Sequence, residues 1–145
     1  MLHTERALVT MADVDAAGII YFATPLRWAE RMSTGWLQAI GHSLSSLFAS
    51  GVTIPAVAVH VDYRSHLKLD DPVRLELSTD AVGTTSFTLC CEAFLGDSGT
   101  AAVQSRTTHV YTRFTNPAMG GAGATKEQVP DWLRTPLTAD IAARR

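Results

Sequence analysis

The alternation of apolar and polar residues divides the chain into strand-like and helix-like stretches. His3 to Met11 combines β-branched and apolar residues and predicts a first strand. From Leu26 to Ile40 the polar residues keep to one stripe at helical spacing, which predicts a long amphipathic helix covered on most sides. Pro25 suits the first turn of this helix and Gly41 suits its end.

A shorter helix and four strands are predicted to follow. Ser43 can cap a helix from about Leu44 to Ala49 that stops at Gly51. Thr53 to Tyr63 is apolar at both alternating phases, as expected for a strand buried on both faces inside a sheet. The other three strands are expected at Val73–Ser78, Thr84–Phe94 and Ala101–Phe114. Short turns between them imply antiparallel pairing, and the order of elements predicts an α+β fold in which one curved sheet wraps the long helix.

The length of 145 residues fits a single hydrophobic core. We assign the domain to residues 1–114 and expect 115–145 to be a flexible C-terminal extension, because Thr115 to Thr125 is rich in Gly, Ala and Asn. Pro130 to Arg134 predicts a short docked helical turn within this extension.

Composition and charge argue against several classes of protein. The net charge is −2 and no run of like charges occurs, so we expect no binding to nucleic acid, which needs a clustered basic face. Neither a signal peptide nor a membrane-spanning stretch is evident, and a cytoplasmic location is expected. The adjacent Cys90 and Cys91 should point to opposite faces of a strand and act as small core residues. No metal-ligand spacing connects the five histidines, so no metal site is predicted.

The segment from Asp13 to Phe22 is the strongest candidate for a functional site. It places two carboxylates and a glycine turn immediately before the long helix. Unpaired N–H groups and the positive end of the helix dipole converge there, which suits an anion or a developing negative charge. The alternative is that Asp13 or Asp15 caps the helix or fixes a turn.

These residues carry a family resemblance, which extends from about Leu8 to Phe114. The acidic loop, Arg27-Trp28, Glu30 and the turn Leu69-Asp70-Asp71-Pro72 resemble the hot-dog-fold acyl-CoA thioesterases, and most of all the 4-hydroxybenzoyl-CoA thioesterase-like branch. The resemblance also includes Thr85-Ser86-Phe87 and Thr108-His109-Val110-Tyr111. It implies a curved antiparallel sheet around a central helix, in a homodimer or homotetramer with active sites between subunits. It also implies hydrolysis of an acyl-CoA thioester, with an aromatic acyl group, to a carboxylic acid and free CoA. The CoA thioester is then a substrate, and no cofactor is expected.

The resemblance also suggests roles for individual residues. Asp15 matches the catalytic carboxylate, which either attacks the thioester carbon or activates water. The backbone amide of Phe22 is the expected oxyanion donor, although its side chain departs from relatives with His or Tyr there. Glu30 is the second candidate for a catalytic acid, with a structural salt bridge as the alternative.

The remaining predicted residues would bind substrate or shape the loop. Asp13 is expected to organise the loop, and Gly18 to allow close approach of the main chain. The expected lining of the acyl pocket is Tyr21 and Trp28 with residues of the partner subunit's second strand, such as Val57 or Val59. His66 stands where many relatives have a smaller residue and would change the polarity of the pocket. A different function remains open: a non-catalytic hot-dog protein that binds CoA esters or another hydrophobic ligand.

Overall fold

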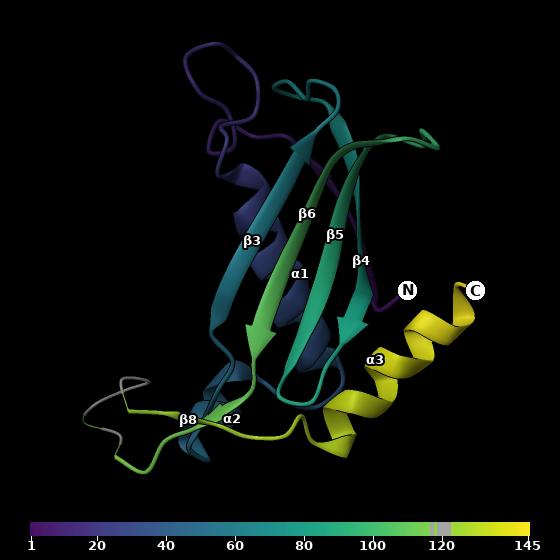
Figure 1. Cartoon of the computed structure of the whole chain (residues 1–145). Coiled ribbons are helices and arrows are strands. Elements are labelled where there is room, and N and C mark those ends of the chain that lie inside the picture. Colours follow the sequence, from purple (N-terminus) through teal and green to yellow (C-terminus); the bar gives the residue numbers. More distant parts are fainter. Residues whose placement is uncertain (117, 119–122) are drawn as a thin grey trace.

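A five-stranded antiparallel sheet packs against one long helix, α1, which crosses behind the sheet in Figure 1. The computed structural model describes residues 1–116, 118 and 123–145. The strand order in the sheet is β1-β4-β5-β6-β3. The strands are β1 (His3–Leu8), β3 (Ala56–Tyr63), β4 (Pro72–Val82), β5 (Ser86–Leu95) and β6 (Ala101–Val110). A small second sheet joins β2 (Val52–Thr53), β7 (Thr112–Arg113) and β8 (Thr125–Lys126). The helices are α1 (Thr24–Ala39), α2 (Leu44–Ala49) and α3 (Asp131–Ala143).

Helix α1 forms the centre of the core, as its amphipathic pattern predicted. Its buried face carries Trp28, Met32 and Trp36, and its polar stripe faces outward. Fully burying each large side chain contributes about 1.5–3 kcal/mol, so this face accounts for much of the stability of the helix. Pro25 lies in the first turn, as expected, and the helix begins two residues earlier than predicted.

The central strands confirm the predicted antiparallel order. On β4, Val73, Leu75 and Leu77 are buried toward α1, while Arg74 and Glu76 are half-buried on the outer face. The turns around Gly83 and Gly96 connect β4 to β5 and β5 to β6, where the sequence placed them. The two cysteines are both buried, as predicted for small core residues.

The prediction for Thr53 to Tyr63 was wrong. The stretch divides at Pro55 into β2, which belongs to the small sheet, and β3, which lies at the edge of the large sheet rather than inside it. Most of β3 is exposed to solvent, including Val57 and Val59. The failure has a physical reason. Apolar residues at both alternating positions predict a strand, but they do not distinguish a central strand from an exposed edge strand.

Helix α3 is longer than the single turn predicted from the sequence. Its Leu133 and Leu137 are fully buried in the same core as α1. It lies along β4 beyond Leu77, the residue paired with the first residue of β1, and the Asp140 carboxylate accepts a hydrogen bond of 2.7 Å from the Thr79 backbone N–H. Arg144 pairs with Asp140 at 3.5 Å. The helix therefore covers the part of the β4 edge that β1 leaves open.

The Gly- and Ala-rich segment 115–125 was expected to be mobile. Residues 117 and 119–122 of that segment lie outside the described residues, so the expectation stays a prediction. Within the described part of the chain, no helix has the length and apolar character needed to cross a membrane.

Candidate functional site

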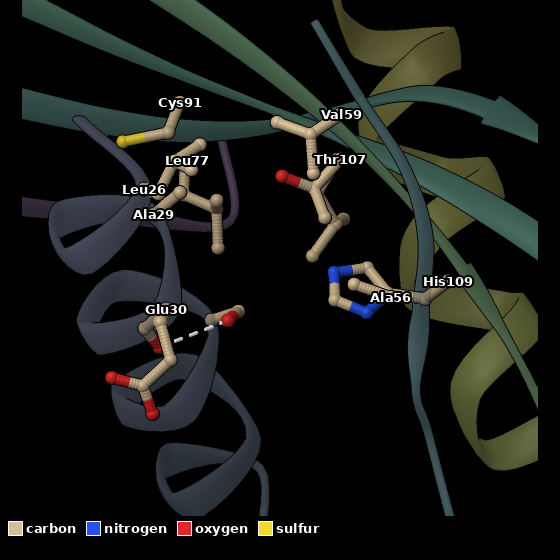
Figure 2. A pocket seen from close by; sticks show the side chains of 11 residues that line it. Leu26, Ala29, Glu30, Ala56, Val59, Leu77, Cys91, Thr107 and His109 are labelled. Atoms are coloured by element: carbon tan, nitrogen blue, oxygen red, sulfur yellow. Dashed lines mark hydrogen bonds between the residues drawn. The ribbon is translucent and has the colours of Figure 1, made fainter. Parts of the chain in front are cut away.

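Two cavities lie beside β3, one at the acidic loop and the other between α1 and the sheet. The first, here called the Asp15 cavity, is lined by Asp15, Tyr21 and Phe22 of the loop and by Tyr63, Arg64 and His66 at the end of β3. The second, here called the helix slot, has a volume of about 270 Å³. Leu26, Ala29 and Glu30 of α1 form one of its walls, and Val59, Thr107 and His109 of the sheet form the other (Figure 2).

The two carboxylates of the loop have different surroundings. Asp13 accepts hydrogen bonds of 2.8 Å from the N–H and the hydroxyl of Thr10, and Arg27 lies 3.2 Å from its other oxygen. These are the contacts of a residue that organises the loop. Neither Asp13 nor Asp15 caps α1, whose N-cap is Ala23 and lacks a side-chain hydrogen bond.

Asp15 fixes a tight turn and still presents a free carboxylate oxygen. Its Oδ1 accepts a 2.8 Å hydrogen bond from the Ala17 N–H, and its backbone carbonyl accepts one of 3.0 Å from Gly18. Its Oδ2 has no hydrogen-bond partner among the described residues, and the side chain is exposed in the Asp15 cavity. Gly18 has φ +76°, a left-handed conformation that glycine adopts without strain. A Cβ at Gly18 would meet open space, so the position requires glycine for its backbone angle.

Backbone donors at the start of α1 point to the same region. Among the described residues, the N–H groups of Phe22 and Ala23 have no hydrogen-bond acceptor. The Tyr63 hydroxyl donates to the Phe22 carbonyl oxygen and so holds the peptide that carries the Ala23 N–H. Unpaired N–H groups at a helix N-terminus form a site suited to an oxyanion. Tyr63 was not singled out from the sequence, because its role depends on β3 ending beside the loop.

Glu30 lies outside the Asp15 cavity. It is exposed at the rim of the helix slot, where its Oε1 accepts a 3.0 Å hydrogen bond from the Thr34 hydroxyl. The neighbouring cations are paired elsewhere: Arg27 contacts Asp13, and Arg31 lies 3.2 Å from Glu5 of β1. The structure therefore separates the two acids that the sequence nominated for catalysis.

The remaining predicted residues divide between the cavities and the core. Tyr21 and His66 line the Asp15 cavity, and Val59 lines the helix slot. Trp28 is only 4% exposed and belongs to the hydrophobic core, where it lines neither cavity. Val57 is 60% exposed on β3 and also lines neither.

The slot contains groups that were not selected from the sequence. His109 and Thr107 face it from β6, and Cys91 lines it from β5, opposite Ser105. Burial, followed by the neighbouring Cys90, raises the pKa of the Cys91 thiol to about 12, so the thiol stays protonated and is a poor nucleophile at neutral pH. The sequence analysis gave His109 only as part of a strand motif and Cys91 only as a core residue, and the register of the sheet brings both to the slot with Thr107.

Metal binding has no candidate cluster in the described ranges. No group of three or more His, Cys, Asp or Glu side chains is placed to hold an ion there. The expectation that the reaction needs no metal or cofactor stays a prediction.

Comparisons with known proteins agree with this geometry. The fold is similar to the crystal structure of a 1,4-dihydroxy-2-naphthoyl-CoA thioesterase from Synechocystis, with a TM-score of 0.80 at 21% identity, covering 93% of this chain and 94% of that one. It is also similar to BH1999 gentisyl-coenzyme A thioesterase, with a TM-score of 0.76 at 20% identity, covering 91% and 99%. These likenesses confirm the predicted hot-dog fold.

A sequence relative and a family model extend the comparison. The 1,4-dihydroxy-2-naphthoyl-CoA hydrolase of Crocosphaera subtropica is 26% identical over 134 residues, which covers 91% of this chain and 96% of the relative. Residues 9–137 match the model of the thioesterase-like superfamily, and this range includes the acidic loop, every strand of the large sheet except β1, and the first half of α3. The resemblance found from the acidic loop, the long helix and the strand turns is thereby confirmed, and the chain belongs to the thioesterase-like superfamily.

Proposed function

We propose that the protein hydrolyses an aromatic acyl-CoA thioester to a carboxylic acid and free CoA, with the chemistry in the Asp15 cavity. One observation carries the proposal: Asp15 and Phe22 line the same cavity, and among the described residues neither the Asp15 Oδ2 nor the Phe22 N–H has a hydrogen-bond partner. The predicted enzyme class, thioester hydrolase, is confirmed by the superfamily and by the relatives named as CoA thioester hydrolases.

The thioester carbonyl oxygen would accept hydrogen bonds from the Phe22 amide, with the Ala23 N–H beside it. Negative charge grows on this oxygen during attack, and each preorganised donor stabilises it by about 2.7–4 kcal/mol. Asp15 then acts in one of two ways. In the first, an Asp15 oxygen attacks the carbonyl carbon, the CoA thiolate leaves, and water hydrolyses the mixed anhydride. In the second, Asp15 removes a proton from a water molecule, the water oxygen attacks the carbonyl carbon, and the CoA thiolate leaves.

An aromatic acyl group is supported by the helix slot and by the relatives. The slot begins beside the loop and is walled by apolar side chains such as Leu26, Leu77 and Leu89. Its size and lining fit a flat ring better than a charged group. The relative from Crocosphaera carries a name that specifies a bicyclic aromatic acyl group.

A homodimer formed through β3 is part of the proposal. The β3 strand is an exposed apolar edge next to both cavities, and pairing with a second copy would cover it and place the site between subunits. Arg64 lines the Asp15 cavity and is the best placed cation for a CoA phosphate. Further assembly to a tetramer, a reaction without metal or cofactor, and a cytoplasmic location stay predictions.

The test is thiol release from a panel of benzoyl-, hydroxybenzoyl-, naphthoyl- and straight-chain acyl-CoAs. We expect turnover with aromatic substrates and a fall in kcat of about a hundredfold or more in Asp15→Asn, which keeps the shape of the side chain. Asp97→Asn is the matched control, because Asp97 is an exposed carboxylate on the β5–β6 turn. Near-normal turnover in Asp15→Asn would reject the role of Asp15. Binding of CoA esters without thiol release across the panel would favour the non-catalytic alternative.

A further inference from the structure

We propose that Tyr63 is a positioning residue of the oxyanion site: its hydroxyl holds and polarises the peptide between Phe22 and Ala23, so that the Ala23 N–H acts as a second donor to the thioester oxygen. This inference rests on the proposed function, because it takes the start of α1 as the oxyanion site. A side chain of the edge strand β3 thereby sets the strength of a donor that belongs to the loop.

The two unpaired N–H groups at the start of α1 belong to successive peptides. The Tyr21 carbonyl oxygen, in the peptide that carries the Phe22 N–H, accepts a hydrogen bond of 2.8 Å from the Thr24 backbone N–H. The Phe22 carbonyl oxygen, in the peptide that carries the Ala23 N–H, accepts one from the Tyr63 hydroxyl. Among the described residues, no backbone N–H donates to this second carbonyl. The first peptide is therefore held by the loop itself, and the second depends on Tyr63.

The hydrogen bond from Tyr63 makes the Ala23 N–H a better donor. A bond to a peptide carbonyl polarises the whole amide group, and this strengthens the N–H of the same peptide. It also fixes the plane of the peptide, so that the N–H keeps its direction while charge develops on the substrate oxygen. The Tyr63 hydroxyl has one proton and donates it to Phe22. Because that proton is not free for the substrate, Tyr63 acts through the peptide and is not itself a catalytic residue.

The position of Tyr63 is set by the end of β3, which lies at the same end of the sheet as the acidic loop (Figure 1). Tyr63 is the last residue of β3 and is paired with β6. The next two N–H groups, of Arg64 and Ser65, both donate to the Ala102 carbonyl oxygen, at 2.8 and 3.1 Å. The backbone around Tyr63 is thus fixed to β6, and its half-exposed side chain lines the Asp15 cavity.

The Tyr63 hydroxyl remains a donor well above neutral pH. Burial raises its pKa above the ordinary value of about 10. The hydrogen bond to Phe22 is therefore present from acid to mildly alkaline solution. Removal of the hydroxyl should lower kcat by the same factor over the range from about pH 6 to pH 9.

The test compares kcat and KM of the wild type and Tyr63→Phe, with the aromatic acyl-CoA of the panel that has the highest kcat/KM. We expect kcat to fall about tenfold, less than the roughly hundredfold or greater loss of a whole oxyanion donor. KM should change less than about threefold, because the hydroxyl does not touch the substrate. Tyr111→Phe is the matched control and should leave kcat unchanged, because Tyr111 is buried in the core and lines neither cavity.

A spectroscopic measurement separates polarisation of the donor from a role in folding. The same ester, isotopically labelled at its thioester carbonyl carbon, is bound to Asp15→Asn, and the infrared stretching frequency of that carbonyl is measured. A hydrogen bond to the oxygen lowers this frequency. We expect a downshift on binding to Asp15→Asn, and a smaller downshift when Tyr63→Phe is added to it.

Tyr63→Phe keeps the half-exposed ring and should fold like the wild type, which circular dichroism checks. Loss of the fold would show a structural role and overturn the inference. An unchanged kcat, a loss that lies wholly in KM, or equal carbonyl downshifts with and without the hydroxyl would also overturn it, and each would leave the thioesterase proposal standing. No thiol release from the wild type with any ester of the panel would overturn both.

Discussion

The two edges of the large sheet are built differently, and the contrast favours the β3 edge for the proposed dimer contact. At the β1 edge, Glu5 forms an ion pair with Arg31 of α1, and Arg6 pairs with Asp97 at 2.8 Å. Beyond Leu77, where the pairing of β4 with the start of β1 stops, α3 covers the edge through the contact between Asp140 and Thr79. The β3 edge carries exposed Val57, Val59 and Tyr63 instead.

Both cavities lie on the β3 side. Exposed apolar side chains on an unpaired sheet edge do not stabilise a monomer and favour association with another strand. The difference supports the proposed dimer, in which the β1 edge is completed within the chain and a second copy would cover the β3 edge. The predictions below test this division, from the largest expected effect to the smallest.

Val57→Lys should have the largest effect, because it places a charge on the β3 edge that a second copy would cover in the proposed dimer. Burying charges of like sign across a symmetric contact costs several kcal/mol, so the dimer should dissociate and the kcat should fall with it. Light scattering coupled to size-exclusion chromatography measures the mass. Leu8→Lys is the control, because Leu8 on β1 is 59% exposed, close to the 60% of Val57. Equal behaviour of the two variants would contradict the division.

Leu137→Ala tests whether α3 is an integral part of the closed side. Leu137 is fully buried, and truncating a buried leucine typically lowers the free energy of unfolding by about 2–5 kcal/mol. Urea denaturation measures the loss, with exposed Thr138→Ala on the same helix as the control. A loss below about 1 kcal/mol would mean that α3 contributes little to the fold.

Asp140→Asn tests the polar contact that covers the β4 edge. Burial by itself raises the pKa of the Asp140 carboxyl, but hydrogen bonds from the Met1 ammonium and Thr79, with the charge of Arg144, hold it below its ordinary value. The carboxylate therefore stabilises the fold above the unfolded pKa of about 3.9, and this stability is lost as the pH falls through the lower folded pKa.

We expect Asp140→Asn to lower the free energy of unfolding by about 1–3 kcal/mol at pH 7, because the buried donor of Thr79 loses a charged acceptor. The difference in melting temperature between wild type and variant should narrow as the pH falls below about 4. A difference that stays constant from pH 7 to pH 3 would rule out a role for the charge.

Arg31→Ala should have the smallest effect. The pair between Arg31 and Glu5 is partly exposed, with side-chain exposures of 48% and 32%, and such pairs contribute about 0.2–1 kcal/mol. Urea denaturation at low and high salt measures the difference, which should shrink as salt screens the pair. A loss above about 2 kcal/mol would show that the ion pair holds β1 in place.

Much of the fold could be predicted from local pattern. The helix around Trp28 to Trp36, the alternation on β4 and the glycine turns between strands all depend on residues close in sequence, so periodicity alone located them. The prediction failed for β3 because edge and centre have the same apolar signature. For α3 the sequence predicted only one turn, because Pro136 lies within the helix and its amphipathic pattern is weak.

The candidate site shows the same limit. The acidic loop could be identified because Asp13, Asp15 and Gly18 are neighbours in the chain, whereas Tyr63 and His109 join the site from β3 and β6. Trp28 was assigned to the acyl pocket on its position in the helix, but the turn of the helix directs it into the core.

The sequence by itself determined the thioesterase-like family, the order of helix and strands, and the loop that carries Asp15, because each depends on short-range patterns of side chains. Only the tertiary structure decided which edge of the sheet stays open, that α3 closes the other, and which strand residues face α1 across the slot. Strand register and helix docking bring together residues far apart in the chain, and no local pattern records those distances.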